Sequence, residues 1–403
     1  MSRPHGGAGL AALRLDDPDL VEAGDPGGML RQVASSAAQV RTALRACDEA
    51  DLSALRPDSR PRAIIAAGAG NCAFAGDALA AICGPGAPVQ VAVVSGYQLP
   101  GWVGAADLVI AVSRSGQTAE ALALANQATR RGCDLVGVAA PGSPLQQVIQ
   151  AARGTFIPVT SGGPARAMPW ALTVPLLVVA SRLGVARVDA DACESAAAVM
   201  EDIAHQCRPS SESFVNPAKS LALDLVGTLP LIWGGSPLAA AAARRFASQL
   251  AANAKYPALA GALPGAGHDQ VEVFDGPFAP APEPEFPAAE DLDVAMDALS
   301  REDVSALDDS AGGQPSLRLV LLADEAGEHD AVARVRAAAA SLAAARGIDL
   351  TELPMEGSHP LPRLAGTVQL LDYASVYLGI ACGIDPLAIA AMKDLRDLTE
   401  RSV

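Results

Sequence analysis

The chain has 403 residues, of which half are apolar but only 3% are aromatic, and its formal net charge is −16. It is long enough for two domains with a core built mainly from Ala, Val and Leu. The negative charge, with no cluster of Lys and Arg against it, excludes a nucleic acid as the expected partner.

Seven cysteines are scattered along the chain, with no pair two or three residues apart. This spacing predicts neither a disulfide framework nor a zinc site, so we expect reduced thiols, a cytoplasmic protein and no resident metal. The first residues lack the apolar stretch of a signal peptide. The most apolar segment, residues 170–185, contains a proline and is shorter than the roughly 20 residues that span a bilayer. We interpret it as a buried helix and expect no membrane partner.

Residues 1–62 are predicted to form a helical segment. After Asp25-Pro26, the stretch "GGMLRQVASSAAQVRTAL" repeats apolar residues at intervals of three and four. From Ala63 the pattern changes to short apolar runs separated by helical stretches: "RAIIAAGAG", "VQVAVV", "LVIAVS", "LVGVAA" and "TFIPVT". This alternation predicts βαβ units with a parallel sheet covered on both faces. We assign residues 63–200 to this first α/β domain, with a closing helix at 169–184.

The same pattern resumes in the second half of the chain. A strand at Leu229–Trp233 runs into Gly234-Gly235-Ser236 and a long helix, and the strands "LRLVLLAD" and "DLTELPM" follow later. Residues 201–403 are therefore predicted to form a second α/β domain. Its Pro-rich and acidic stretch at about 277–315 is interpreted as a surface insertion.

The turn after the strand "LVIAVS" carries the strongest chemical signal. Its sequence, Ser-Arg-Ser-Gly-Gln-Thr, places three hydroxyl groups, those of Ser113, Ser115 and Thr118, around a glycine at the start of a helix. Free N–H groups at a helix N-terminus favour anions, and hydroxyl groups add donors without bulk. Simple capping would need only one hydroxyl. We therefore predict a phosphate-binding loop.

Three further positions are candidates. The turn "AAGAGNCAFAGD" around Gly70 follows a strand but lacks the third glycine and the acidic residue of a dinucleotide site, so we expect no dinucleotide and no other cofactor. Cys72 in the same turn begins a helix, which suggests a lowered thiol pKa. Arg166 lies in a Gly/Pro loop and could hold an oxyanion. His268, beside Asp269, could carry a proton, although a lone histidine is more often structural.

Together these segments resemble the bifunctional phosphoglucose/phosphomannose isomerases, which are built from two SIS (sugar isomerase) domains. "GAGNCAFAGD" is similar to the family's Gly-Met-Gly-Gly-Ser loop, and "VSRSGQTAEAL" to its Val-Ser-Tyr-Ser-Gly-Asn-Thr-x-Glu sugar-phosphate loop. "YQLPGWV", "PARAMP", "NPAKSLAL" and the C-terminal "LDYASVYLGIACGIDPLAIAAMKDLRDL" follow in the family's order. The resemblance implies two flavodoxin-like αβα sandwiches, a hexose 6-phosphate substrate and no cofactor.

Carried onto this chain, the resemblance assigns roles to individual residues. Ser113, Ser115 and Thr118, together with Gly70, would bind the sugar phosphate, and Arg166 would face the enediol oxygens. His268 would assist ring opening and would reach the active site of a partner subunit, which implies a homodimer.

The chain departs from the family at the catalytic base. Where the family has Asn-Glu-Asn-Ala-Lys, this chain has Ala251-Ala252-Asn253-Ala254-Lys255, so that Ala252 replaces the glutamate that moves the proton. The serine of the first glycine turn becomes Cys72 or Asn71, depending on the register. A family lysine near the C-terminus falls at Arg396, with Lys393 one turn away.

Two functions remain open from the sequence. The first is a sugar-phosphate isomerase whose base has moved to His268 or to a carboxylate such as Asp269, Glu272 or Glu201. The second is a protein that binds sugar phosphate without chemistry and serves a sensing or regulatory role. A dinucleotide-dependent oxidoreductase shares the α/β pattern but lacks the glycine fingerprint.

Overall fold

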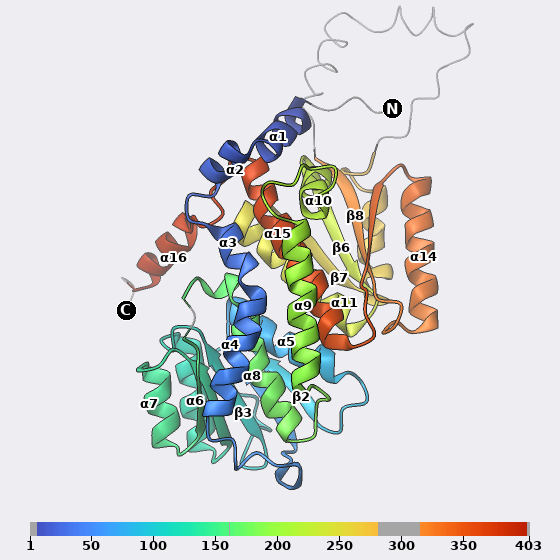
Figure 1. The fold of residues 1–403 in the computed structure, drawn as a ribbon. Helices are drawn as coiled ribbons and strands as arrows, with labels where there is room; N and C mark the ends of the chain where they lie inside the picture. Colours follow the sequence, from blue (N-terminus) through green and yellow to red (C-terminus); the bar gives the residue numbers. More distant parts are fainter. Residues whose placement is uncertain (1–5, 161, 281–314, 401–403) are drawn as a thin grey trace, which may run out of the picture.

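The computed structural model describes residues 6–160, 162–280 and 315–400 and shows an α/β protein with two parallel sheets (Figure 1). The predicted α/β class and its two-sheet organisation are confirmed. The predicted domain limits stay predictions, and nearly all of the expected insertion at 277–315 lies outside the described residues.

The N-terminal segment is helical, as predicted, with α1 (Gly6–Asp16), α2 (Pro18–Gly24), α3 (Met29–Ala34) and α4 (Ser36–Glu49). Asp25 starts α3, because its carboxylate accepts hydrogen bonds from the backbone N–H groups of Met29 (2.7 Å) and Leu30 (2.8 Å). The Asp25 carboxylate therefore satisfies the first N–H groups of this helix.

The first sheet has five parallel strands in the order β2-β1-β3-β4-β5, which is the flavodoxin-like order. The strands are β1 (Ala63–Ala67), β2 (Gln90–Val94), β3 (Leu108–Ser113), β4 (Asp134–Ala139) and β5 (Thr155–Pro158). All five were predicted from their apolar runs. The associated helices are α5 (Ala73–Cys83), α6 (Ala119–Arg130), α7 (Pro144–Ala151) and α8 (Pro169–Arg182), the last at the predicted closing position.

The second sheet has four parallel strands in the order β7-β6-β8-β9. They are β6 (Thr228–Gly234), β7 (Leu259–Ala262), β8 (Ser316–Ala323) and β9 (Asp349–Pro354), and β7 was not predicted. Its sequence, Leu-Ala-Gly-Ala, contains no β-branched residue that would signal a strand. The helices of this half are α9 (Ala190–Gln206), α10 (Pro217–Leu225), α11 (Pro237–Gln249), α14 (Asp330–Ala345), α15 (Pro360–Ala381) and α16 (Ala390–Glu400).

One hydrophobic core joins the two sheets. Side chains alternate along each strand, so Ile64 of β1 and Ile232 of β6 both face a central layer of helices that includes α4, α8, α9, α11 and α15. Figure 1 shows α4, α9 and α15 between the sheets. The opposite strand faces pack against α6 and α7 in the first sheet and against α14 in the second.

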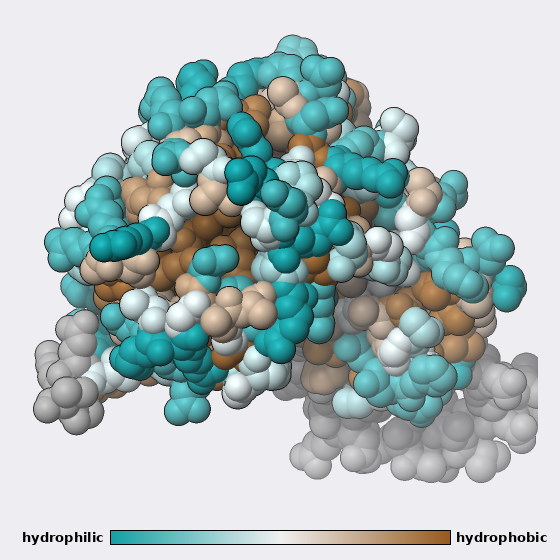
Figure 2. All heavy atoms as spheres, turned by 90° about the horizontal axis from the view of Figure 1, so that it is seen from below, coloured by the Kyte–Doolittle hydropathy of each residue, from teal (hydrophilic) through white to brown (hydrophobic). Residues whose placement is uncertain are grey.

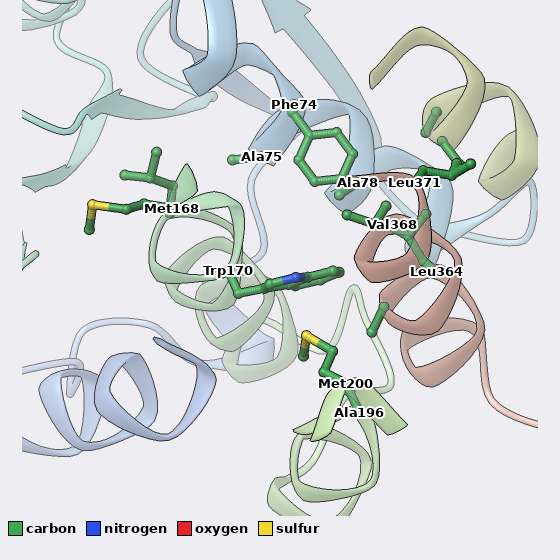
Figure 3. Packing of buried hydrophobic residues seen from close by; sticks show 14 of the residues in the cluster. Phe74, Ala75, Ala78, Met168, Trp170, Ala196, Met200, Leu364, Val368 and Leu371 are labelled. Atoms are coloured by element: carbon green, nitrogen blue, oxygen red, sulfur yellow. The ribbon is translucent and has the colours of Figure 1, made fainter. Parts of the chain in front are cut away.

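Trp170 of α8 marks the middle of this core (Figure 3). Its indole is fully buried between Phe74 of α5 and Met200 of α9, and the Phe74 and Trp170 rings meet edge to face with centroids 6.4 Å apart. Leu364 and Val368 of α15 lie beside it. Helices from both halves of the chain thus share the same packed interior.

Within the described residues, one helix, α15, is long and apolar enough to cross a membrane, but 94% of its apolar window is buried inside the protein. The predicted apolar helix of residues 170–185 corresponds to α8, which is also buried. On the face seen from below, hydrophilic side chains dominate and hydrophobic surface gathers in recessed areas (Figure 2).

A buried ion pair ties α11 to α15. The guanidinium group of Arg245 contacts the carboxylate of Asp372 at 2.5 Å, and both side chains are only 2% exposed. The same guanidinium lies over the ring of Phe74, 4.7 Å from its centroid, and donates to the backbone carbonyl of Arg166 at 2.9 Å. Arg245 therefore links both halves of the chain.

Asp372→Asn is expected to reduce the free energy of unfolding by about 3–5 kcal/mol, because it leaves the Arg245 charge buried without a counter-charge. Urea denaturation measures this loss. Glu201→Gln, which breaks a pair with Arg41 at the surface, is the matched control and should change the midpoint far less. Equal effects of the two substitutions would contradict the view that the buried ion pair, unlike the surface pair, stabilises the fold.

Candidate functional site

The predicted phosphate loop forms the turn between β3 and α6. Ser113 ends β3 and is 1% exposed, and its hydroxyl oxygen accepts a hydrogen bond from the Gly116 N–H at 3.0 Å. The hydroxyl groups of Ser113 and Thr118 also hydrogen-bond to each other. Only one of these two hydroxyls donates in that bond, so the other keeps its hydrogen for a further acceptor.

The neighbouring loop after β4 fixes the shape of this turn. The Gly116 carbonyl accepts from the Leu145 N–H at 3.0 Å, and the Arg114 carbonyl accepts from the Ala140 N–H at 3.1 Å. Gly116 has a left-handed backbone (φ +66°), and a Cβ there would overlap the Ser143 side chain. Only glycine satisfies both the conformation and the close approach.

The start of α6 is not capped by a hydroxyl group. Thr118 occupies the N-cap position, but its side chain makes no capping hydrogen bond because it bonds to Ser113 instead. Among the described residues, the hydroxyl oxygen of the half-buried Ser115 accepts one hydrogen bond, from the Gln117 N–H at 3.3 Å. The simple capping interpretation is therefore wrong for Thr118, and the first N–H groups of α6 stay available to an anion.

The first glycine turn lies next to the Arg166 loop. Gly70 has the positive φ (+56°) that its turn requires, and a Cβ there would meet no atom within 4 Å. The short 3-10 turn Gly70–Cys72 packs against the turn Ala165–Ala167. Arg166 is therefore adjacent to the end of the first sheet.

Arg166 connects the two halves of the chain at this point. It is 6% exposed, its Nε donates to Asn253 Oδ1 at 3.0 Å, and its Nη2 donates to the Pro386 carbonyl at 2.9 Å. Burial lowers the pKa of the guanidinium, and the negative charge of Asp385 opposes that shift. Its Nη1 has no hydrogen bond among the described residues.

Ala252 lies in a π-helical turn, Leu250–Ala254, that continues α11. Such turns are rare and often occur at functional sites. Asn253 of this turn donates to Ser375 at 2.9 Å and accepts from Arg166, so the turn is held from both sides. Ala252, where the sequence resemblance leads us to expect a base, thus precedes the residue that bonds Arg166 and has only a methyl group.

Lys255 follows this π turn in a left-handed conformation (φ +55°). Its Nζ donates to the carbonyls of Ala252 (2.9 Å), Asn253 (3.4 Å) and Asp385 (3.1 Å). Burial and the charge of Arg166 lower the pKa of Lys255, whereas Asp385 opposes the shift. Asn253 and Lys255 were visible in the quoted motif, but the contribution of Asp385 was missed because no local pattern signals it.

The other predicted residues lie elsewhere. His268 is exposed, and the neighbouring Gly267 packs toward Val335 of α14, on the outer side of the second sheet. His268 makes no side-chain hydrogen bond with the described part of this chain. The structure therefore does not bring His268 to Arg166 within one chain.

The carboxylates that the sequence suggested as replacement bases also lie away from Arg166 and the π turn. Glu201 pairs with Arg41 at the surface, at 2.5 Å, so it is not a base in the site. The carboxylate of Asp269 accepts from the Gln270 N–H, and the charge of Glu272 acts on Arg346. The two alternative C-terminal residues, Lys393 and Arg396, both lie on the exposed helix α16.

The equivalent turn of the second sheet, Gly234-Gly235-Ser236, is filled by acidic side chains. The Glu328 carboxylate lies where a Cβ of Gly235 would be, and Ser236 donates to Asp324 at 2.6 Å. Arg336 and Arg363 pair with these two carboxylates. These paired side chains already occupy the turn, so an anion is less readily accommodated there than at the turn of the first sheet.

The prediction for Cys72 was wrong. The thiol is only 8% exposed, and burial raises its pKa more than the nearby backbone and charge of Arg114 lower it. A protonated, buried thiol is a packing residue rather than a nucleophile. Within the described residues, no group of three His, Cys, Asp or Glu side chains is arranged to hold a metal ion.

Comparison with known proteins identifies relatives. Residues 214–398 match the family model for the bacterial phospho-glucose isomerase C-terminal SIS domain. A bifunctional phosphoglucose/phosphomannose isomerase of Caldicellulosiruptor bescii is 28% identical over 214 residues, which are 53% of this chain and 63% of that protein. The match thus spans less than two thirds of that relative.

Two further comparisons extend over more of the chain. A bifunctional phosphoglucose/phosphomannose isomerase of Aquifex aeolicus is 25% identical over 305 residues, 76% of this chain and 80% of that protein. The structure of a hypothetical protein from Thermus thermophilus superimposes with a TM-score of 0.66 at 16% identity, covering 98% of this chain and 94% of that one. At this identity the structural likeness establishes the fold alone.

Gly116→Ala is expected to lower the free energy of unfolding by at least about 1 kcal/mol more than Gly142→Ala does. Both glycines have positive φ, but only a Cβ at Gly116 meets another side chain, whereas Gly142 faces open space. Urea unfolding of both variants measures the difference. Equal losses would show that the contact with Ser143 does not restrict the loop.

Cys72 is expected to react with iodoacetamide near neutral pH more slowly than free cysteine does, because its raised pKa leaves little thiolate. Cys382 is the internal reference: burial raises the pKa of its thiol as well, but the residue is exposed and should therefore react faster than the buried Cys72. Mass spectrometry of labelled peptides gives both rates. A Cys72 rate above that of free cysteine would restore the nucleophile hypothesis.

Proposed function

We propose that this chain, a relative of the bifunctional phosphoglucose/phosphomannose isomerases, binds a hexose 6-phosphate and interconverts its aldose and ketose forms. The hydroxyl loop (residues 113–118) contacts the Gly70 turn through the Arg114 backbone and Cys72, and the Gly70 turn packs against the Ala165–Ala167 turn. Arg166 in turn bonds Asn253 of the π turn. The observation that carries this proposal is this chain of contacts, which joins three elements: the hydroxyl loop, the Arg166 side chain and the π turn that contains Ala252. Each has a distinct task in such a reaction.

The hydroxyl loop is suited to the phosphate. Ser115 and Thr118 offer hydroxyl groups, the uncapped N-terminus of α6 offers N–H groups, and the Gly70 turn beside them leaves room for close approach. Ser113 supports this loop by orienting Thr118 through their shared hydrogen bond. An anion here gains hydrogen bonds that the protein does not satisfy internally.

Arg166 is suited to stabilise the oxygen atoms bound to the reacting carbons. An enediol carries negative charge that develops during the reaction, and a fixed cation near it lowers the barrier. The guanidinium is held by Asn253 and by the Pro386 carbonyl, so it needs no rearrangement to act. The neighbouring Lys255 adds a second positive charge to this region of an otherwise acidic protein.

The proton transfer itself requires a base, and an alanine methyl group cannot serve. General acid–base catalysis contributes roughly 10²–10⁴-fold, whereas positioning and charge stabilisation act separately. Activity in this chain therefore depends on another proton acceptor. His268 contributes from the partner subunit in the proposed homodimer, where it assists ring opening. We also propose that this dimer works in the cytoplasm.

Because Ala252 cannot accept a proton, it favours a second function, in which the protein binds sugar phosphate without converting it. The loop would then report sugar-phosphate levels to another protein. The two functions share every binding residue and differ only in proton transfer, so one measurement separates them.

We expect the protein in deuterated water to incorporate deuterium at C2 of the aldose formed from fructose 6-phosphate, as followed by proton NMR. Incorporation shows proton exchange with solvent during an enediol reaction, even at low turnover. Saturable binding without incorporation supports the sensing function instead. Absence of both binding and incorporation contradicts the proposal in either form.

Thr118→Ala is expected to weaken fructose 6-phosphate binding by about 10–100-fold, because hydrogen bonds to charged groups contribute about 1.5–3 kcal/mol. Calorimetric titration measures the change. Ser341→Ala, on the outer helix α14, is the matched control and should bind as the unmodified chain does. Unchanged binding in Thr118→Ala would place the phosphate elsewhere.

A further inference from the structure

Because Ala252 has no carboxylate, the base for the reaction must come from another residue. The carboxylates near Arg166 and Lys255 are the candidates. The charge of Asp385 acts on both Arg166 and Lys255, and the charges of Asp25 and Asp385 act on each other. Asp25 is already occupied, because both of its oxygens accept the backbone N–H groups that start α3. Of these two carboxylates, Asp385 is the one that remains available.

Two hydrogen bonds attach the segment that contains Asp385 to the site. Its backbone carbonyl accepts from Lys255 Nζ at 3.1 Å, and the same Nζ donates to the Ala252 carbonyl at 2.9 Å. The next residue, Pro386, accepts from Arg166 at 2.9 Å. One ammonium group thus joins the backbone of Asp385 to the position where the family carries its glutamate.

The side chain of Asp385 is exposed and only partly engaged. Its Oδ1 accepts from the Leu387 N–H at 2.8 Å, which shapes the turn before α16. Its Oδ2 has no hydrogen bond among the described residues. The turn is held in place by Leu387, which packs against Gly27 so closely that a Cβ there would overlap it.

We propose that Asp385 replaces the absent glutamate as the base that moves the proton between C1 and C2 of the bound sugar phosphate. This inference rests on the proposed isomerase function. Lys255 bonds the Asp385 carbonyl and Arg166 bonds the next carbonyl, so two positively charged side chains lie beside the segment that holds this carboxylate. The carboxylate of Asp25 is a like charge nearby.

The step is balanced without a further reactant. An Asp385 oxygen takes the proton from C2 of the open-chain aldose, and the electron pair of the broken C2–H bond forms the C1=C2 bond while the C1 carbonyl becomes an enediolate oxygen beside Arg166. The proton then returns from the carboxylic acid to C1. The hydroxyl proton of O2 passes to O1, and C2 becomes the carbonyl carbon.

Asp385→Asn tests this assignment, because asparagine keeps an oxygen acceptor for the Leu387 N–H but is not a base. We expect deuterium incorporation from fructose 6-phosphate to fall at least about 100-fold, with binding of fructose 6-phosphate changed less than about threefold. Asp394→Asn on α16 is the matched control and should retain incorporation. Thermal unfolding of both variants verifies that they fold.

A rescue variant separates failure of this inference from failure of the proposed function. Ala252→Glu in the Asp385→Asn background should restore incorporation, because it returns a carboxylate to the family position. Incorporation that persists in Asp385→Asn overturns the role of Asp385 and leaves the isomerase function standing. A native chain without incorporation, whose Ala252→Glu variant gains it, overturns both.

Discussion

The buried guanidinium of Arg245 is the interaction on which the arrangement of the site depends. It pairs with Asp372 of α15 and donates to the backbone carbonyl of Arg166, which Gln249 also contacts at 2.8 Å. Removing a charge from water is costly, so this group must remain paired and hydrogen-bonded. The result is that the Arg166 loop, which follows the first sheet, is positioned by helices of the second half.

The π turn at Leu250–Ala254 keeps its shape although it lacks the carboxylate that the family resemblance leads us to expect there. Asn253 still joins Arg166 to Ser375, and Lys255 still closes the turn through three carbonyl groups. Packing and hydrogen bonding therefore preserve the scaffold independently of the catalytic group. Such a scaffold is expected both in a protein that has lost its catalytic activity and in one whose base has moved to a neighbouring turn. Only the carboxylates around the scaffold distinguish the two cases.

Local patterns predicted most of the fold and the local part of the site. Eight of the nine strands in the described residues and the hydroxyl turn followed from apolar runs and turn residues, whereas β7 carried no such signal. The lowered pKa expected for Cys72 was wrong because burial outweighs the helix N-terminus. Asp385 could not be predicted, since its link to Lys255 joins residues 130 positions apart in the chain. Such contacts follow from the packing of whole helices and not from any neighbouring sequence.

The helical layer shared by the two sheets has a consequence for motion. Proteins that close around a ligand often rotate two domains about a hinge, each domain keeping its own interior. Here Ile64 of the first sheet and Ile232 of the second pack into one interior, and its side chains interlock across α8, α9 and α15. A hinge motion between the sheets would separate these packed side chains and expose them to water. Any adjustment to a ligand is therefore left to side chains and short surface segments, not to movement of one sheet against the other.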